Sequence, residues 1–131
     1  MMEFNWLGVL VATILSFVFG ALWYSPLLFM QRWCEESGVD PSKDMANPVQ
    51  VYLSTFLLTL MSALTLAFLL GPYPSISNAL MVSVLIGVGL TAASMGINYQ
   101  FAGRSQMYWF IDAGFHVCRF AVIALTLALW P

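Results

Sequence analysis

Four long apolar stretches constrain this chain more than any other feature of its sequence. They cover about residues 5–26, 50–70, 76–99 and 107–130, and each approaches the roughly 20 apolar residues that a helix needs to cross the hydrocarbon. Hydrophobic residues make up 61% of the chain, well above the roughly 45–50% of soluble domains. Because the bilayer core offers backbone groups no water, each stretch is predicted to be helical. The sequence therefore predicts one all-α domain over 1–131, an integral membrane bundle of four transmembrane helices.

The connectors between these stretches carry very different amounts of charge. Most of the charged residues lie in the connector 31–49, one arginine lies in the third connector, and the second connector has none. Lys and Arg accumulate in the cytoplasmic connectors of membrane proteins. Arg32, Lys43 and Arg104 belong to connectors that four antiparallel spans place on one face. We therefore expect the 31–49 loop to lie in the cytoplasm and both termini to lie outside.

The residues that follow the first span, 27–38, allow two interpretations. They form either a short interfacial helix on the cytoplasmic membrane surface, ended by Gly38, or an extension of the first span beyond a kink at Pro26. Trp23 and Tyr24, just before this proline, suit the aromatic belt at the membrane interface. In the first interpretation, the side chains expected to face lipid are Leu27, Met30, Trp33 and Cys34.

Small residues recur at every fourth position in three of the spans, which places them along one face of each helix. In lipid, close approach of backbones over small residues supplies the packing that the hydrophobic effect cannot supply. The third span has three further small residues, Gly89, Ala93 and Gly96, on a second face, so we expect that span to be central. Four helices enclose little interior, which favours a homo-oligomer. The residues expected to pack helices together are Gly8, Ala12, Ser16, Gly20, Gly87, Gly89, Ala93 and Gly96.

The fourth span carries Asp112, His116 and Arg119 within eight residues, and in a helix they project within about 60° of one another. An Asp and an Arg at mid-depth cost about 5–7 kcal/mol, whereas the strongly apolar residues of this span contribute about 3–6 kcal/mol toward insertion. The span therefore needs partners, and its polar face must be turned from lipid. Spacing allows a hydrogen bond between Asp112 and His116. Asn98 and Tyr99 of the third span are expected to form the opposite wall.

This polar face suggests a binding or transport function. A carboxylate beside an imidazole can pass a proton, and a guanidinium can hold an anionic substrate or a lipid head group. The favoured hypothesis is that the protein binds or moves a small solute, ion or proton at an intramembrane polar pocket. Asp112 and His116 would be its proton-linked pair, and Arg119 its anion or counter-ion site. The alternative is a non-catalytic assembly or scaffold subunit whose polar stripe only specifies helix pairing.

Other functional classes lack their sequence signatures. The net charge of −2 includes no basic stripe for nucleic acid. No HExxH motif, second carboxylate or Ser/His/Asp constellation accompanies Asp112, so an enzyme is not expected. Neither a metal site nor a cofactor is predicted, because His116 could ligate haem only together with a second copy and no CxxCH motif is present. Cys34 and Cys118 lie in dissimilar surroundings, so the sequence does not predict a structural disulfide.

Four short stretches resemble a known family: NW at 5–6, GALWYSPLLF at 20–29, NYQFAGRS at 98–105 and IDAGFHV at 111–117. On these residues the chain resembles a bacterial family of small membrane proteins classed only as a domain of unknown function, number seventeen-sixty-one. The resemblance implies a four-helix inner-membrane protein and supplies no established activity. The positions that belong to the family's pattern are Trp23, Tyr24, Pro26, Asn98, Asp112 and His116. The role of Arg119 rests on the physical argument alone.

Overall fold

The computed structural model describes residues 5–130, and every regular element in that range is helical. Four helices are long and apolar enough to cross a membrane, so the predicted all-α bundle with four membrane-spanning helices is confirmed. The third of them is continuous but changes its winding in the middle. In chain order the elements are α1 (Trp6–Trp23), α2 (Met30–Ser37), α3 (Pro48–Leu70), α4 (Ile76–Val84), the π-helical segment η1 (Leu85–Ala92), α5 (Ala93–Phe101) and α6 (Gln106–Leu129).

Local capping signals set the boundaries of these helices. Asn5 accepts a hydrogen bond from the backbone at the start of α1, at 2.9 Å. Ser75 and Ser105 do the same for α4 and α6, at 3.1 Å and 3.0 Å. Pro48 occupies the first turn of α3, and Gly38 ends α2 in the left-handed conformation, with φ of 81°. The polar residues between the apolar stretches therefore decide where each helix begins and ends.

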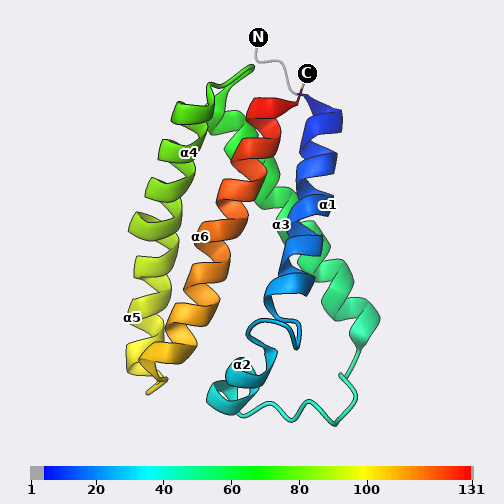
Figure 1. Ribbon diagram of the computed structural model, residues 1–131, viewed down its shortest axis with the longest axis vertical. Helices are drawn as coiled ribbons and strands as arrows, with labels where there is room; N and C mark the ends of the chain where they lie inside the picture. Colours follow the sequence, from blue (N-terminus) through cyan, green and yellow to red (C-terminus); the bar gives the residue numbers. More distant parts are fainter. Residues whose placement is uncertain (1–4, 131) are drawn as a thin grey trace.

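Helix α6 is the centre of the bundle and the most buried of the four spans. It packs against α1, α3, α4, η1 and α5, and Figure 1 shows it between α1 on one side and α4–α5 on the other. The expectation that the third span is central was therefore wrong. Gly89 and Ala93 of that span lie on the exposed surface, and no atom comes within 4 Å of a Cβ built on Gly89. Gly96 instead faces the indole of Trp109 on α6, with a built Cβ 3.2 Å from its nitrogen.

The apolar core lies in the half of the bundle where α1 begins and α6 ends. Small residues bring the helices together along these contacts. Gly8, Ala12 and Ser16 are buried on α1, and a Cβ built on Gly87 would lie 3.0 Å from the Cα of Val117. The buried core residues are Val9, Ala12, Ala63, Leu66, Leu70, Ala79, Phe120, Ile123, Ala124 and Leu127.

The π-helical segment Leu85–Ala92 interrupts the third span in the middle of the membrane. Such segments are rare. Their wider turns join each carbonyl to the N–H five residues later instead of four. The indole nitrogen of Trp109 donates a 2.9 Å hydrogen bond to the carbonyl oxygen of Ala92, where the segment ends. In lipid, where water cannot reach a carbonyl, a side-chain donor of this kind helps to satisfy the altered backbone.

Helix α2 is separate from α1, so the residues after the first span do not simply extend it. The chain turns over residues 24–29, and the backbone N–H of Phe29 donates to the carbonyl of Trp23 at 3.1 Å. α2 then lies across the end of the bundle near the start of α6 (Figure 1). Of the two interpretations drawn from the sequence, the structure has the short separate helix.

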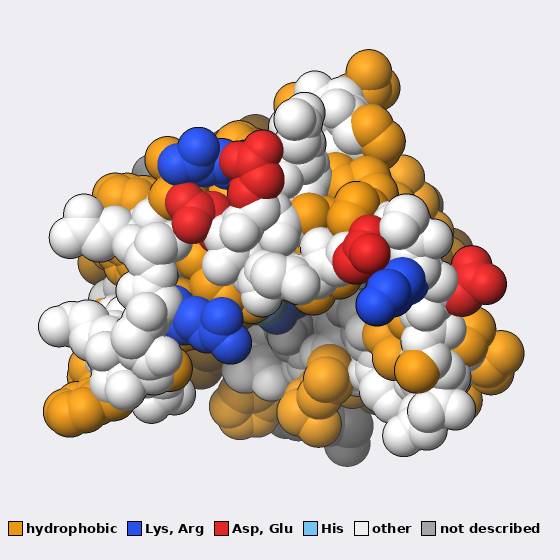
Figure 2. Space-filling model, turned by 90° about the horizontal axis from the view of Figure 1, so that it is seen from below, with side chains coloured by type: hydrophobic (Ala, Val, Ile, Leu, Met, Phe, Trp, Pro, Cys, Tyr) orange, Lys and Arg blue, Asp and Glu red, His pale blue; other side chains and the backbone are white. Residues whose placement is uncertain are grey.

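The same end of the molecule gathers the charged side chains of the connectors. Figure 2 views this end, which is recessed near its middle, with Lys or Arg side chains on both sides of the recess. Arg32 pairs with Glu36 at 3.1 Å and lies 3.9 Å from Glu35. The sides of the bundle are instead covered by exposed apolar residues, such as Leu58 and Met61 of α3. This division fits helices that are surrounded by a lipid bilayer.

Candidate functional site

Asp112 lies about two turns into α6, where three other segments aim hydrogen-bond donors at its carboxylate. Its Oδ1 accepts from the hydroxyl of Tyr24, at 2.7 Å, and from the indole nitrogen of Trp33, at 2.9 Å. Its Oδ2 accepts from the hydroxyl of Tyr99. Tyr24 follows α1, Trp33 belongs to α2 and Tyr99 belongs to α5. One side chain therefore ties three segments to the central helix.

The three donors are all neutral, and they suit an ionised carboxylate, which only accepts hydrogen bonds. Bonds to an ionised partner are roughly twice as strong as those between neutral groups. Burial and the Asp112 carboxylate raise the pKa of Tyr24 well above its ordinary range, so its phenol stays a donor. The three groups that bond directly to Asp112 are thus oriented dipoles, and none of them is a cation.

Aromatic rings enclose this carboxylate. Tyr24 packs edge-on against Trp33 at 5.8 Å between ring centroids and against Phe115 at 5.2 Å. Tyr108 packs against Tyr99 at 5.1 Å and against Trp33 at 6.2 Å. These rings partly shield the hydrogen bonds and supply dispersion contacts in the half of the bundle that lacks the apolar core.

The sequence-based expectations for these residues had mixed outcomes. Trp33 does not face lipid as expected, because its indole N–H donates to the partly buried carboxylate of Asp112. Tyr99 does lie against Asp112, whereas Asn98 is exposed, since neighbouring helix residues point about 100° apart. The direct hydrogen bond between Asp112 and His116 that their spacing allows is not formed among the described residues; each has other partners.

Arg119 lies about two turns further along α6, close to the middle of the span. Its Nε donates to Nδ1 of His116 at 2.8 Å, and its Nη2 donates to the hydroxyl of Ser62 on α3 at 3.2 Å. The guanidinium carbon lies 4.5 Å from the centroid of the Phe120 ring and 5.9 Å from that of Phe115, which adds cation–π attraction. These contacts cover the flat face of the guanidinium and two of its three nitrogens.

The third guanidinium nitrogen, Nη1 of Arg119, is enclosed and has no hydrogen-bond partner among the described residues. The hydroxyl of Ser16 on α1 also has no hydrogen-bond partner in the described part of the chain, and this residue is 1% exposed. A Cβ on Gly20 would lie 3.1 Å from the Phe115 ring. Gly20 and Phe115 are therefore at the same depth. Ser16 lies one turn before Gly20 on α1, and Arg119 lies one turn after Phe115 on α6. Because the two helices are antiparallel (Figure 1), both steps lead in the same direction, and Ser16 lies at the level of Arg119. Two unsatisfied polar groups therefore lie at one depth of the bundle.

His116 is a hydrogen-bond acceptor at Nδ1, so its neutral ring carries the proton on Nε2. None of the hydrogen bonds within residues 5–130 uses this Nε2. His116 and Arg119 are both only partly buried. The donors available at this level are therefore the Nε2–H of the imidazole, the N–H groups of Nη1 and the hydroxyl of Ser16.

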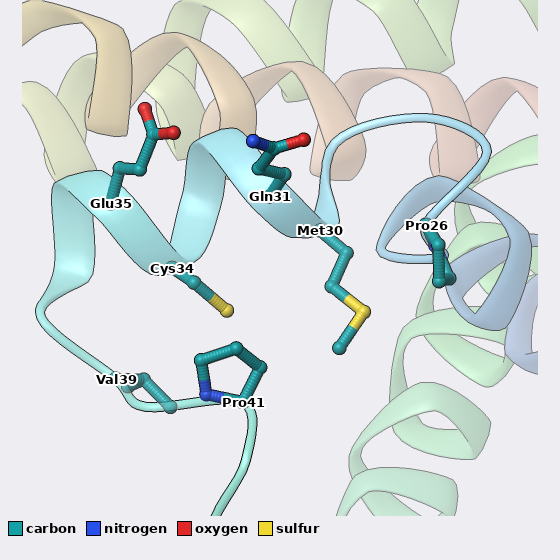
Figure 3. A pocket seen from close by; sticks show the side chains of 7 residues that line it. All are labelled: Pro26, Met30, Gln31, Cys34, Glu35, Val39 and Pro41. Atoms are coloured by element: carbon teal, nitrogen blue, oxygen red, sulfur yellow. The ribbon is translucent and has the colours of Figure 1, made fainter.

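A separate surface pocket of about 400 Å³ lies beside α2, and neither Asp112 nor Arg119 lines it. Figure 3 shows Met30 and Cys34 pointing into it across from Pro41, whereas other side chains at its edge point away. Its lining residues are Pro26, Met30, Gln31, Cys34, Glu35, Val39 and Pro41. Among residues 5–130 no three His, Cys, Asp or Glu side chains group closely enough to hold a metal ion.

Sequence reasoning missed three residues of this region: Tyr24, Trp33 and Ser62. Tyr24 and Trp33 were interpreted as side chains of the lipid interface, which such residues commonly are. The signal that could have found them is Asp112 itself, because a carboxylate near the end of a span needs donors from that same end. Ser62 carries no such signal, since serine is common in membrane helices.

These features define an α-helical, multi-pass membrane protein whose central helix carries a tethered carboxylate and a partly unsatisfied guanidinium. The chain belongs to the family described as Protein of unknown function (DUF1761), which matches residues 7–128. The resemblance drawn from the sequence is thereby confirmed. No curated protein and no solved structure matched the chain.

Proposed function

We propose that this protein is a non-catalytic membrane protein that binds, and moves across the inner membrane, a small solute with an anionic oxygen group, held at Arg119. The observation that carries the proposal is the enclosed Nη1 of Arg119, which has no partner among the described residues. A buried polar group without a partner costs about 1–3 kcal/mol, and more if it is charged. An oxygen of a bound ligand would remove this cost.

The surroundings of Arg119 support an oxygen anion as the ligand. A guanidinium binds carboxylate and phosphate oxygens along its edge, and here the free edge is the one that contains Nη1. The hydroxyl of Ser16 and the Nε2–H of His116 would supply further donors at the same level. Phe115 and Phe120 flank the guanidinium, so the site would accept a ligand that has an apolar part.

The charge distribution supports a direction of access. α2 and the two connectors that carry Lys43 and Arg104 lie at one end of the bundle (Figure 1), and Arg32 belongs to α2. The surface at this end is recessed (Figure 2). The preference of Lys and Arg for the cytoplasmic side favours this end as the cytoplasmic one, with both termini in the periplasm. The ligand would then reach Arg119 from the cytoplasm, past the aromatic rings around Asp112.

Binding of sodium benzoate to the protein in lipid nanodiscs, measured by calorimetry, tests this proposal. Benzoate combines a carboxylate with an apolar ring. We expect Arg119→Gln to weaken its binding by about tenfold to a hundredfold, the loss of one or two hydrogen bonds to a charged group. Arg104→Gln removes the same charge from the surface and serves as the matched control. Equal affinities of the wild type and Arg119→Gln would show that the proposal is wrong.

The scaffold alternative has one observation in its favour. The Asp112 carboxylate is fully occupied by donors from three other segments, which is what a residue that only specifies helix pairing would need. In that case the wild type binds no benzoate, and Arg119→Gln changes the state of assembly that size-exclusion chromatography measures. The ligand proposal expects the reverse: binding is lost and the assembly is unchanged.

A further inference from the structure

We infer that the site takes up one proton with each monoanion that it binds, and that Asp112 is the residue that receives this proton. This inference rests on the proposed function and specifies its substrate class and its coupling. The spans contain very few charged side chains. Within the four spans of the described chain, Asp112 and Arg119 are the only Asp, Glu, Lys or Arg residues.

The two opposite charges balance each other when no ligand is bound. Seven residues of helix separate them by about 10 Å along α6, and they lie on nearly the same side of it. The donors around Asp112 are the neutral side chains of Tyr24, Trp33 and Tyr99, so Arg119 is the cation of this interior. An anion bound to Arg119 would leave the carboxylate of Asp112 without a compensating charge in a medium where charges are expensive. A proton on Asp112 restores the balance.

His116 is less suited to receive the proton. Its Nδ1 already accepts the N–H of Arg119 Nε, and its Nε2 holds the proton of the neutral ring. A second proton would place two donors face to face and break this hydrogen bond. The proton would therefore have to displace Arg119 from the imidazole.

Asp112 can receive the proton without losing its neighbours. A phenol hydroxyl both donates and accepts, so Tyr99 can turn its hydroxyl and accept from a protonated Oδ2. Oδ1 keeps the bonds from Tyr24 and Trp33. The bond between Tyr99 and Asp112 is thus reversed rather than broken.

The other groups that face this region leave Asp112 as the site of the charge change. From the segment after α1 there is Tyr24, from α5 Tyr99 and from α6 Tyr108, all phenols. Arg104 lies over the ring of Tyr108, 5.6 Å from its centroid. α2 and α3 contribute the uncharged Trp33 and Ser62.

Two consequences follow for the ligand. The affinity for a monoanion should rise about tenfold for each unit by which the pH is lowered, as one linked proton requires. A dianion such as sulfate would need two protons, and one carboxylate supplies only one. The site should therefore select monoanions.

Proton uptake on addition of sodium benzoate, followed with a pH electrode in lightly buffered nanodisc samples, tests the inference. The wild type should take up about one proton for each benzoate bound. Asp112→Asn keeps the size of the side chain and acceptors for Tyr24 and Trp33, and should bind benzoate at neutral pH without proton uptake. Asp44→Asn, the same charge change in an exposed loop, should behave as the wild type.

The outcomes separate the two proposals. Benzoate bound by the wild type without proton uptake, or with an affinity that does not change with pH, overturns this inference and leaves the proposed function intact. The absence of any benzoate binding to the wild type overturns both. If Asp112→Asn does not fold, the pH dependence of the wild-type affinity decides alone.

Discussion

Helix α6 runs through two regions of the molecule that are held together in different ways. Along 120–127 it packs into the apolar core, where Ile123 and Ala124 are 0% exposed. Along 114–119 every residue is only partly buried, and the contacts are hydrogen bonds and aromatic rings around Asp112 and Arg119. Dispersion between close-packed small residues is sufficient at one end. At the other end, directed bonds fix α2 and leave polar groups available.

The largest effect is expected from removal of the carboxylate at the centre of the hydrogen-bonded region. Asp112→Ala leaves three partly buried donors without their acceptor, so it should lower the free energy of unfolding by about 3–5 kcal/mol. Titration with a denaturing detergent, followed by circular dichroism, measures this loss. Asp44→Ala, in the exposed loop, is the control and should change it by less than about 0.5 kcal/mol. A loss of under about 1 kcal/mol for Asp112→Ala would mean that the donors find water.

A slightly smaller effect is expected from a cavity in the apolar core. Ile123→Ala removes a side chain that is 0% exposed and should cost about 2–4 kcal/mol. The loss should be global, so hydrogen exchange in residues 30–37 should not quicken before the whole chain unfolds. If α2 unfolded first in this variant, the stability of the hydrogen-bonded region would depend on the apolar core.

Removal of one donor should separate α2 from the rest of the bundle. Trp33→Phe keeps an aromatic ring at this position but removes the indole N–H and its 2.9 Å bond to Asp112. The expected cost is about 1–2 kcal/mol. Hydrogen exchange should quicken in residues 30–37 and stay slow in 120–127. Tyr73→Phe, at a residue that is 84% exposed, loses one polar group without such an effect. Unchanged exchange in α2 would contradict the tethering role of Trp33.

The smallest effect is expected at the surface of the same helix. Arg32→Gln breaks the exposed pair with Glu36 and should cost no more than about 0.5 kcal/mol, with less loss at high salt. Thermal unfolding at two salt concentrations measures this difference. A loss comparable to that of Trp33→Phe would mean that ion pairs, rather than the bond to Asp112, hold α2.

The sequence allowed the spans, the all-helical class and the family to be predicted, because each depends on composition and on local residues. It also placed Tyr99 against Asp112, since a buried acid requires polar neighbours. It could not show that Trp33 turns inward, because a tryptophan beside charged residues is equally suited to a lipid interface. The pairing of Arg119 with Ser62 depends on how α3 crosses α6, which no local pattern encodes.

The π-helical segment Leu85–Ala92 determines which way Tyr99 points. In an unbroken α-helix, the twelve residues from Gly87 to Tyr99 would turn Tyr99 about 120° away from the face that meets α6. One wide turn removes roughly one residue's rotation, about 100°, and returns Tyr99 to that face. The wide turn therefore restores the orientation of the second half of the third span relative to α6. Deletion of a single residue such as Val88 would shorten the helix by one position yet preserve the alignment of both ends with α6.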